Sequence, residues 1–276
     1  MSKFNSSSTT NQVIITLASS TVVASTLVTV AAAVTTNPTV ASSVYTISES
    51  TSADTLAVSS PAYSITVGAA NQVAFTTQPS GGTGGSAFGT QPVVTVEDAG
   101  GNTVTTDSSS QVTLSITTGT GTAGATLACT TNPVTAVNGV ATFAGCKIDK
   151  VGSNYKLHAT DGILTPADSS PFNVTAGPAA TLVFTVQPGG GTSNVAWAQQ
   201  PQVTLYDAGG NVTTDPTVPV LSITPGTPTS GGPSTLSGCA GTNTSGVVNY
   251  TGCKIDRPGT GYQLRATDSA ITADSS

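Results

Sequence analysis

Four cysteines are the side chains in this sequence whose spacing most clearly allows chemistry. They fall as two pairs, Cys129 with Cys146 and Cys239 with Cys253, with 16 and 13 residues between the members. Neither pair has the Cys-x-x-Cys spacing, and the chain holds one histidine, so a zinc site lacks ligands. The alternative to a disulfide is two buried thiols in each pair. We expect a disulfide in each pair, worth about 3 kcal/mol in the chain-entropy model, and therefore an oxidising compartment.

Catalysis requires groups that this sequence does not gather. His158 is the only imidazole, and an internal repeat places Arg265 at the equivalent position, which argues against a general base. We expect His158 to face solvent on a strand. The glycine-rich run at 81–85 is expected to be a flexible loop, because no helix follows it to supply the N-terminal dipole that holds a phosphate. We predict neither an enzyme nor a bound cofactor.

Pairs of aspartates are the candidate metal ligands. The pairs are Asp98 with Asp107, Asp207 with Asp215, and Asp161 with Asp168. Calcium takes about six to eight oxygen ligands, several of them carboxylates, and each pair supplies few. We favour the interpretation that single aspartates cap turns, with calcium as the weaker alternative. A melting temperature measured with and without EDTA distinguishes the two.

Two copies of the sequence Asp-Ala-Gly-Gly-Asn predict tight turns. One copy contains Asp98, Gly101 and Asn102, and the other contains Asp207, Gly210 and Asn211. An aspartate that begins a turn accepts hydrogen bonds from backbone N–H groups ahead of it, and glycine adopts positive φ without strain. These residues are therefore assigned a structural role.

The turns belong to an internal repeat. Residues 70–79 return as residues 179–188, and the sequence Gly-Cys-Lys-Ile-Asp at 145–149 returns at 252–256. A period near 108 residues is too long for a solenoid and fits one whole β-sandwich. We therefore expect each copy to fold around its own core.

The repeat divides the chain into three segments. We define the partial repeat as residues 1–68, the first repeat as residues 69–176 and the second repeat as residues 177–276. The sequence from Ser59 resembles that from Ser169, so the partial repeat is expected to be the end of a shortened module or an N-terminal β segment. The second repeat stops where the first continues into Phe172–Val174, so it lacks a last strand. Either the chain is a segment of a longer array, or the empty edge receives a neighbour's strand.

Alternation of polar and apolar residues predicts strands in the first repeat. The expected strands are Val73–Phe75, Val93–Val96, Val112–Ile116, Val140–Phe143, Tyr155–Ala159 and Phe172–Val174. Charged residues make up only 7% of the chain and aromatic residues 5%, as in short strands joined by small polar turns. We predict an all-β fold of tandem immunoglobulin-like antiparallel β-sandwiches with Greek-key connections.

Tyr155 and Tyr262 each follow an aspartate by six residues, in a corner that leads into a late strand. This pattern resembles the tyrosine corner of immunoglobulin-type sandwiches, whose phenol oxygen returns to nearby backbone. Together with Phe-x-x-Gln-Pro, the Asp-Ala-Gly-Gly-Asn turn and Asn-Gly-Val-Ala-Thr-Phe, it resembles the bacterial immunoglobulin-like repeats of large surface proteins and adhesins, over residues 70–276. The resemblance implies secreted or wall-displayed modules that act as stalks, spacers or adhesive tips. The second repeat departs from it at 245–250, which puts the packing of that strand in doubt.

Charge limits the partners. Seven basic and thirteen acidic residues give a net charge of -6, with no run of either sign, whereas nucleic-acid binding needs clustered cations. A carbohydrate platform would need exposed aromatic rings, and Trp197 is the only tryptophan. The expected partners are other modules of the same protein, neighbouring subunits or a surface ligand.

Residues 13–34 carry no charge, so an export signal or a membrane anchor is an alternative to strands there. Serine and threonine interrupt the segment and β-branched residues are frequent, which favours strands. We expect no membrane insertion.

The sequence therefore predicts a non-catalytic structural or adhesive segment of an extracellular bacterial surface protein. The alternative is a self-assembling subunit of an extracellular filament or virus particle that exchanges strands at the second repeat. Light scattering separates the two, because a monomer favours the first hypothesis and ordered polymers favour the second.

Overall fold

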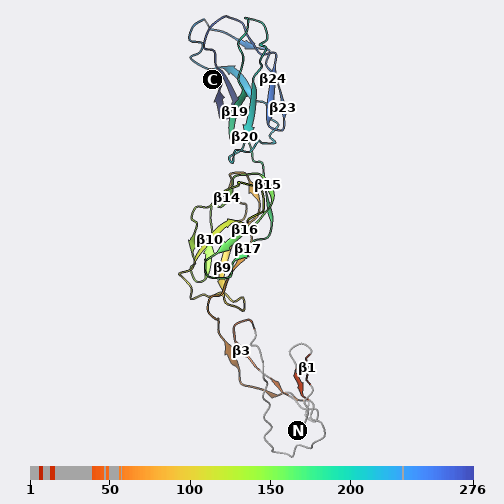
Figure 1. The fold of residues 1–276 in the computed structure, drawn as a ribbon, viewed down its shortest axis with the longest axis vertical. Coiled ribbons are helices and arrows are strands. Elements are labelled where there is room, and N and C mark those ends of the chain that lie inside the picture. Colours follow the sequence, from red (N-terminus) through yellow and green to blue (C-terminus); the bar gives the residue numbers. More distant parts are fainter. Residues whose placement is uncertain are drawn as a thin grey trace, which may run out of the picture. The chain divides into compact units, whose positions relative to one another are not determined.

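The computed structural model describes residues 39–46, 48, 49, 56, 58–231 and 233–276, together with strands at 6–8 and 13–15 (Figure 1). Every regular element in these residues is a β-strand, so none of them forms a helix that could cross a bilayer. The all-β fold expected from the sequence is confirmed. The chain divides into two compact units, Met1–Asn37 and Pro38–Ser276.

The first unit is described at one strand pair. Strand β1 (Ser6–Ser8) runs antiparallel to β2 (Val13–Ile15), with Ser7 opposite Ile14. The segment 13–34, for which strands, a signal and an anchor were weighed, begins in β2, and residues 16–34 lie outside the described residues.

The first repeat is built on two main antiparallel sheets, with strand orders β13-β9-β7 and β12-β10-β16-β17. Their strands are β7 (Gln72–Thr77), β9 (Val93–Glu97), β10 (Gln111–Ile116), β12 (Val134–Thr135), β13 (Val140–Thr142), β16 (Leu157–Thr160) and β17 (Ala167–Asp168). This division of strands between two sheets is that of an immunoglobulin-like sandwich.

Alternating side chains of the two sheets form the core of the first repeat. In β10, Val112 and Leu114 are buried, whereas the residues between and before them are exposed, because successive side chains of a strand point to opposite faces. Val94 and Val96 of the other sheet belong to the same buried cluster. The apolar residues of both sheets therefore share one interior.

A third, smaller sheet closes the side of this sandwich. Strand β18 (Phe172–Thr175) pairs antiparallel with β15 (Gly152–Tyr155) and parallel with β8 (Gly82–Thr83). The ring of Phe172 lies edge-on to Phe88, with centroids 5.2 Å apart, and 6.2 Å from the ring of Tyr155. Strand β18 thus covers the aromatic end of the core.

Two sequence predictions about this region were wrong in detail. Tyr155–Ala159 was expected to be one strand, but it is interrupted at Lys156, between β15 and β16. The run at 81–85 was expected to be a loop, but Gly82 and Thr83 form β8. The N–H groups of Gly84 and Gly85 donate to the carbonyls of Thr175 and Ile148, so this run is tied to its own repeat.

The second repeat reproduces the two main sheets, with strand orders β19-β20-β24-β23 and β21-β26-β27. Its strands are β19 (Thr181–Val186), β20 (Gln202–Tyr206), β21 (Val220–Ile223), β23 (Ala240–Thr244), β24 (Val247–Thr251), β26 (Leu264–Asp268) and β27 (Ile271–Asp274). The register repeats as well, since Leu114 faces Ala159 across one sheet and Leu221 faces Ala266 across the other. Its described residues contain no counterpart of β18.

The described part of the partial repeat has the pairing of a module's last strands. Strand β3 (Ser42–Tyr45) pairs with β6 (Tyr63–Ile65), and β4 (Ser48–Glu49) pairs with β5 (Val58–Ser59). The ring of Tyr45 lies 5.9 Å from that of Tyr63, much as Tyr155 lies against Phe172. Tyr45 of the partial repeat and Tyr155 of the first repeat therefore occupy equivalent positions.

Candidate functional site: disulfides, turns and tyrosine corners

The structure joins the cysteines into one disulfide per full repeat. The sulfur atoms of Cys129 and Cys146 are 2.06 Å apart, and those of Cys239 and Cys253 are 2.10 Å apart. Each bridge adjoins a two-stranded ladder, formed by β11 (Leu127–Ala128) with β14 (Lys147–Ile148) and by β22 (Leu236–Ser237) with β25 (Lys254–Ile255). The bridges therefore tie down equivalent edges of the two sandwiches.

Three tyrosines make the same contact with the backbone five residues earlier. The hydroxyl of Tyr155 donates to the carbonyl of Lys150 at 2.9 Å, and that of Tyr262 donates to Arg257 at 3.1 Å. The third, Tyr45, donates to the carbonyl of Val40 at 2.6 Å and was not identified from the sequence. Its signal was the likeness of the sequence around Val44 to that around Asn154. Each tyrosine corner fixes the loop that precedes it.

The Asp-Ala-Gly-Gly-Asn turns are held by their aspartates. Oδ1 of Asp98 accepts the N–H groups of Gly100 and Asn102, both at 2.9 Å. Asp207 makes the same two bonds to Gly209 and Asn211, also at 2.9 Å. The second glycine of each turn has a positive φ, 81° at Gly101 and 80° at Gly210, which glycine adopts without the clash of a Cβ atom.

The same aspartates also bind the segments that enter each repeat. Oδ2 of Asp98 accepts the N–H of Gly68 at 2.8 Å, and Oδ2 of Asp207 accepts that of Gly177 at 3.0 Å. The Gly68 N–H, followed by the backbone N–H of Asn102, lowers the pKa of Asp98 from 3.8 to about 2. Asp98 is therefore held as an acceptor over most of the pH range.

Four of the candidate calcium ligands, Asp98, Asp107, Asp207 and Asp215, accept hydrogen bonds from N–H or O–H donors. Oδ2 of Asp161, by contrast, is buried without a hydrogen-bond partner among the described residues. Asp107 accepts the N–H groups of Ser109 and Ser110 and the hydroxyl of Ser110, and the last bond lowers its pKa most. Asp215 accepts the N–H of Thr217 at 2.9 Å. The described residues contain no cluster of three or more potential metal ligands. Calcium binding stays an untested prediction.

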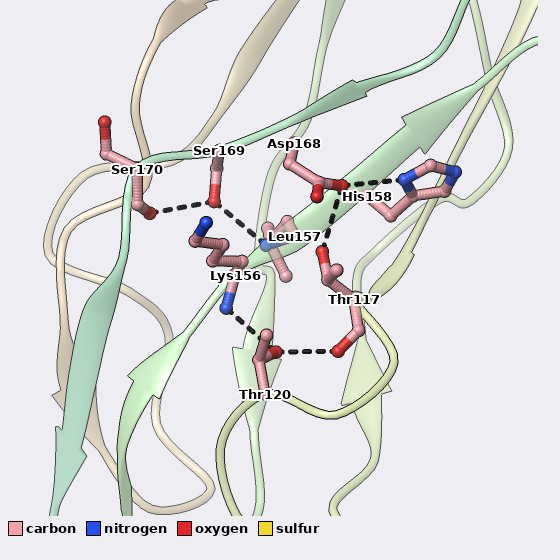
Figure 2. Close-up of polar contacts among 8 residues, drawn as sticks. All are labelled: Thr117, Thr120, Lys156, Leu157, His158, Asp168, Ser169 and Ser170. Atoms are coloured by element: carbon pink, nitrogen blue, oxygen red, sulfur yellow. Dashed lines mark hydrogen bonds and ion pairs between the residues drawn. The ribbon is translucent and has the colours of Figure 1, made fainter.

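His158 faces Asp168 across the pair β16 and β17 (Figure 2). Its Nδ1 lies 2.7 Å from Oδ1 of Asp168, which also accepts the hydroxyl of Thr117 at 3.1 Å. The bond to His158 lowers the pKa of Asp168. Both side chains are about two-fifths exposed, so the pair lies at the surface of the sheet.

A network of backbone contacts surrounds this pair and recurs in the second repeat. The hydroxyl of Ser169 accepts the N–H of Leu157 (Figure 2). In the second repeat, the hydroxyl of Ser275 accepts the N–H of Leu264 in the same way. Arg265 takes the place of His158 and binds both oxygens of Asp274 at 2.7 Å. The repeat aligns His158 with Arg265, and Asp168 was named only as a candidate calcium ligand. Spacing alone did not indicate that Asp168 and Asp274 lie opposite these residues, because it does not reveal the strand register.

Trp197 is buried in the core of the second repeat. It is 9% exposed, and it occupies the position that Phe88 has in the first repeat, three residues before a Gln-Pro pair. A carbohydrate platform requires an exposed ring face, and this ring belongs instead to the buried cluster of its repeat.

Comparisons with known proteins add little. No protein-family model and no curated protein matches the sequence. Among solved structures, the chain is similar to FdeC, described as a broadly conserved Escherichia coli adhesin that elicits protection against urinary tract infections. The match has 18% identity and a TM-score of 0.33, and it covers 78% of this chain and 67% of the other. A similarity this low carries no argument about function.

Proposed function

We propose that this chain is a non-catalytic structural or adhesive segment of an extracellular bacterial surface protein, in which the repeats serve as stalk or display units. The proposed organisation is a partial module within residues 1–68 and modules at 69–176 and 177–276. The main support is that each full repeat has its own buried cluster and its own disulfide. A unit with its own core can be joined in series without relying on its neighbours.

The disulfides support an extracellular location. Disulfides persist in oxidising environments and are rare in the cytosol, where thiols are kept reduced. The proposed partners are other modules of the same protein, neighbouring subunits or a surface ligand, and nucleic acid is not among them. Antibody labelling of intact cells of the organism that encodes this chain should detect it at the surface. Labelling only after lysis would contradict the proposal.

Mechanical unfolding of the full chain tests the stalk role. Pulling the chain by its ends should give two main unfolding events, one for each full repeat. Reduction should lengthen the events, because the disulfides shield segments of 17 and 14 residues from extension. At roughly 3.4 Å per residue the gains are about 60 Å and about 50 Å. A single unfolding event, or event lengths that do not change on reduction, would contradict the proposal that the two repeats bear force independently.

A self-assembling subunit is the second candidate, and one observation favours it. Tyr155 is fully buried beneath β18, whereas Tyr262, without such a strand, is half-buried. An uncovered edge can accept a strand from another chain. A peptide with the sequence of residues 171–175 should then raise the unfolding midpoint of the second repeat and shorten any polymers seen by light scattering. A chain that stays monomeric, with an unfolding midpoint that the peptide does not change, would exclude this candidate.

A further inference from the structure

The asparagine that ends each Asp-Ala-Gly-Gly-Asn turn reaches the repeat before it. In the second repeat, Nδ2 of Asn211 donates to the carbonyl of Asp149 at 2.6 Å, and its Oδ1 accepts the N–H of Val151 at 3.0 Å. Both partners belong to the loop that Tyr155 fixes by binding Lys150 between them. One carboxamide thus binds a carbonyl and an N–H two residues apart, as a neighbouring strand would.

The same contact occurs where the first repeat follows the partial repeat. Nδ2 of Asn102 donates to the carbonyl of Thr39 at 2.6 Å, and its Oδ1 accepts the N–H of Ala41 at 2.9 Å. Here Tyr45 binds Val40, the residue between the two partners. None of the loop residues is identical between the two places, so the asparagine binds backbone geometry and not a side chain.

The first glycine of each turn explains how the turn fits against the loop. A Cβ atom on Gly209 would lie 2.1 Å from the carbonyl oxygen of Asp149, and one on Gly100 would lie 2.4 Å from that of Thr39. Neither glycine has a positive φ. The three atoms nearest to a Cβ atom on Gly209 all belong to the first repeat, at Asp149, Gly84 and Gly85, so the obstacle to alanine there is the neighbouring repeat. By contrast, a Cβ atom on Gly210 would touch nothing within 4 Å, and that glycine serves the φ of the turn alone.

We propose that the loop before each corner tyrosine is a docking surface, and that its partner is the Asp-Ala-Gly-Gly-Asn turn of the repeat that follows. The aspartate of the turn accepts the N–H of the glycine before the repeat's first strand, Gly68 or Gly177. The first glycine of the turn lets the turn approach the loop closely, and the asparagine forms hydrogen bonds with the loop. This joint concerns contacts inside the chain, so it holds whether or not the repeats are displayed on a cell.

The equivalent loop of the second repeat offers a reduced version of this surface. Tyr262 fixes Arg257 as Tyr155 fixes Lys150, but Pro258 stands where Val151 supplies its N–H. Proline has no backbone N–H, so a turn that docks here would form one hydrogen bond to the loop in place of two. A further turn, from the same chain or a second molecule, should bind this loop more weakly.

Two pairs of variants in the full chain test the joint. Val151→Pro removes the N–H and copies a residue that the second repeat accommodates, and Val151→Ala is its control because it keeps the N–H. Gly209→Ala blocks close approach, and Gly190→Ala is its control, because Gly190 lies in the same repeat outside the turn and a Cβ atom there would have nothing within 4 Å. Residual dipolar couplings measured by NMR show whether the two full repeats share one alignment tensor. Hydrogen exchange of the Asn211 carboxamide reports the contact itself.

In the parent chain and in both controls, we expect one shared alignment tensor. Val151→Pro and Gly209→Ala should give separate tensors for the two repeats and exchange at the Asn211 carboxamide at least about fivefold faster, the factor for losing one net hydrogen bond. Shared tensors and unchanged exchange in both variants would overturn the proposal, as would separate tensors in the parent. If Gly209→Ala unfolds the second repeat, Val151→Pro decides, because it lies in the first.

Discussion

The two full repeats share their edges and differ in their interiors. Turns, tyrosine corners, disulfides and the surface carboxylate pairs recur at equivalent positions. The buried cluster, however, contains 17 residues in the first repeat and 11 in the second. Leu114 is 3% exposed while its counterpart Leu221 is half-buried. The first repeat should therefore be the more stable, since buried apolar area provides most of the stabilisation.

Part of this difference comes from one strand, β18. Phe172 and Val174 of β18 belong to the first buried cluster, and the described residues of the second repeat have no strand in that place. The features that depend on local sequence thus recur in both repeats, while the larger buried cluster of the first repeat includes two residues from β18.

Removing the disulfides should have the largest effect on this comparison. In the chain-entropy model each bridge contributes about 3 kcal/mol, because the two loops have similar length. Replacing both cysteines of a pair by serine should lower the stability of that repeat only. We expect the second repeat to become largely unfolded and the first to stay folded. The chain's single tryptophan, Trp197, reports the second repeat by fluorescence. Equal losses of structure in the two repeats would contradict the prediction that the first repeat is the more stable.

Removing a buried hydroxyl from the second repeat, or adding one to the first, tests how differently the two cores are packed. Tyr250 occupies the position of Phe143, and its buried hydroxyl donates to the carbonyl of Pro219. Burial raises the pKa of Tyr250 well above its usual value, so the phenol stays protonated. Tyr250→Phe should cost the second repeat about 1 kcal/mol, because it removes this hydrogen bond. Phe143→Tyr should cost the first repeat about 2 kcal/mol, because Phe143 is 1% exposed and the added hydroxyl must enter a packed core. Urea unfolding of each variant measures both, and a gain in stability from either would be contrary to the packing described.

Acid should weaken the turn of the first repeat. The folded pKa of Asp98, about 2, lies below the 3.8 of a free aspartate. A group whose pKa is lowered by folding stabilises the fold above its unfolded pKa and loses that contribution as the pH falls through its folded pKa. The contribution of Asp98 should therefore fade between about pH 4 and pH 2. Carboxyl carbon shifts measured by NMR give the pKa directly, and a value near 4 would show that the bond to Gly68 is absent.

The surface pairs should contribute least. His158 and Asp168 are both partly exposed, so solvent screens their attraction, and such pairs are worth less than about 1 kcal/mol. His158→Arg copies the second repeat and should raise the midpoint of the first transition slightly. Arg265→His should lower the midpoint of the second, because it removes a contact with two hydrogen bonds. Calorimetry at neutral pH measures both shifts. A large change in either would mean that the pair supports the core.

Local patterns made much of the fold predictable from the sequence. The alternation of Val112 and Leu114 with polar neighbours predicts β10, and the repeated Asp-Ala-Gly-Gly-Asn sequence predicts a turn held by Asp98. Contacts between repeats were not predictable, because the partner of Asn211 is backbone about 60 residues away and backbone has no sequence signature. Gly209 was read as a turn residue for the same reason, although its close neighbour is the carbonyl of Asp149.

Denaturant unfolding of the full chain, followed by two probes in one titration, tests the central claim most directly. Trp197 fluorescence follows the second repeat, and NMR amide signals of β9 and β10 follow the first. Two separate cores of unequal size predict two transitions, with the Trp197 signal lost at the lower denaturant concentration. A single coincident transition, or loss of the β9 and β10 signals first, would contradict the account.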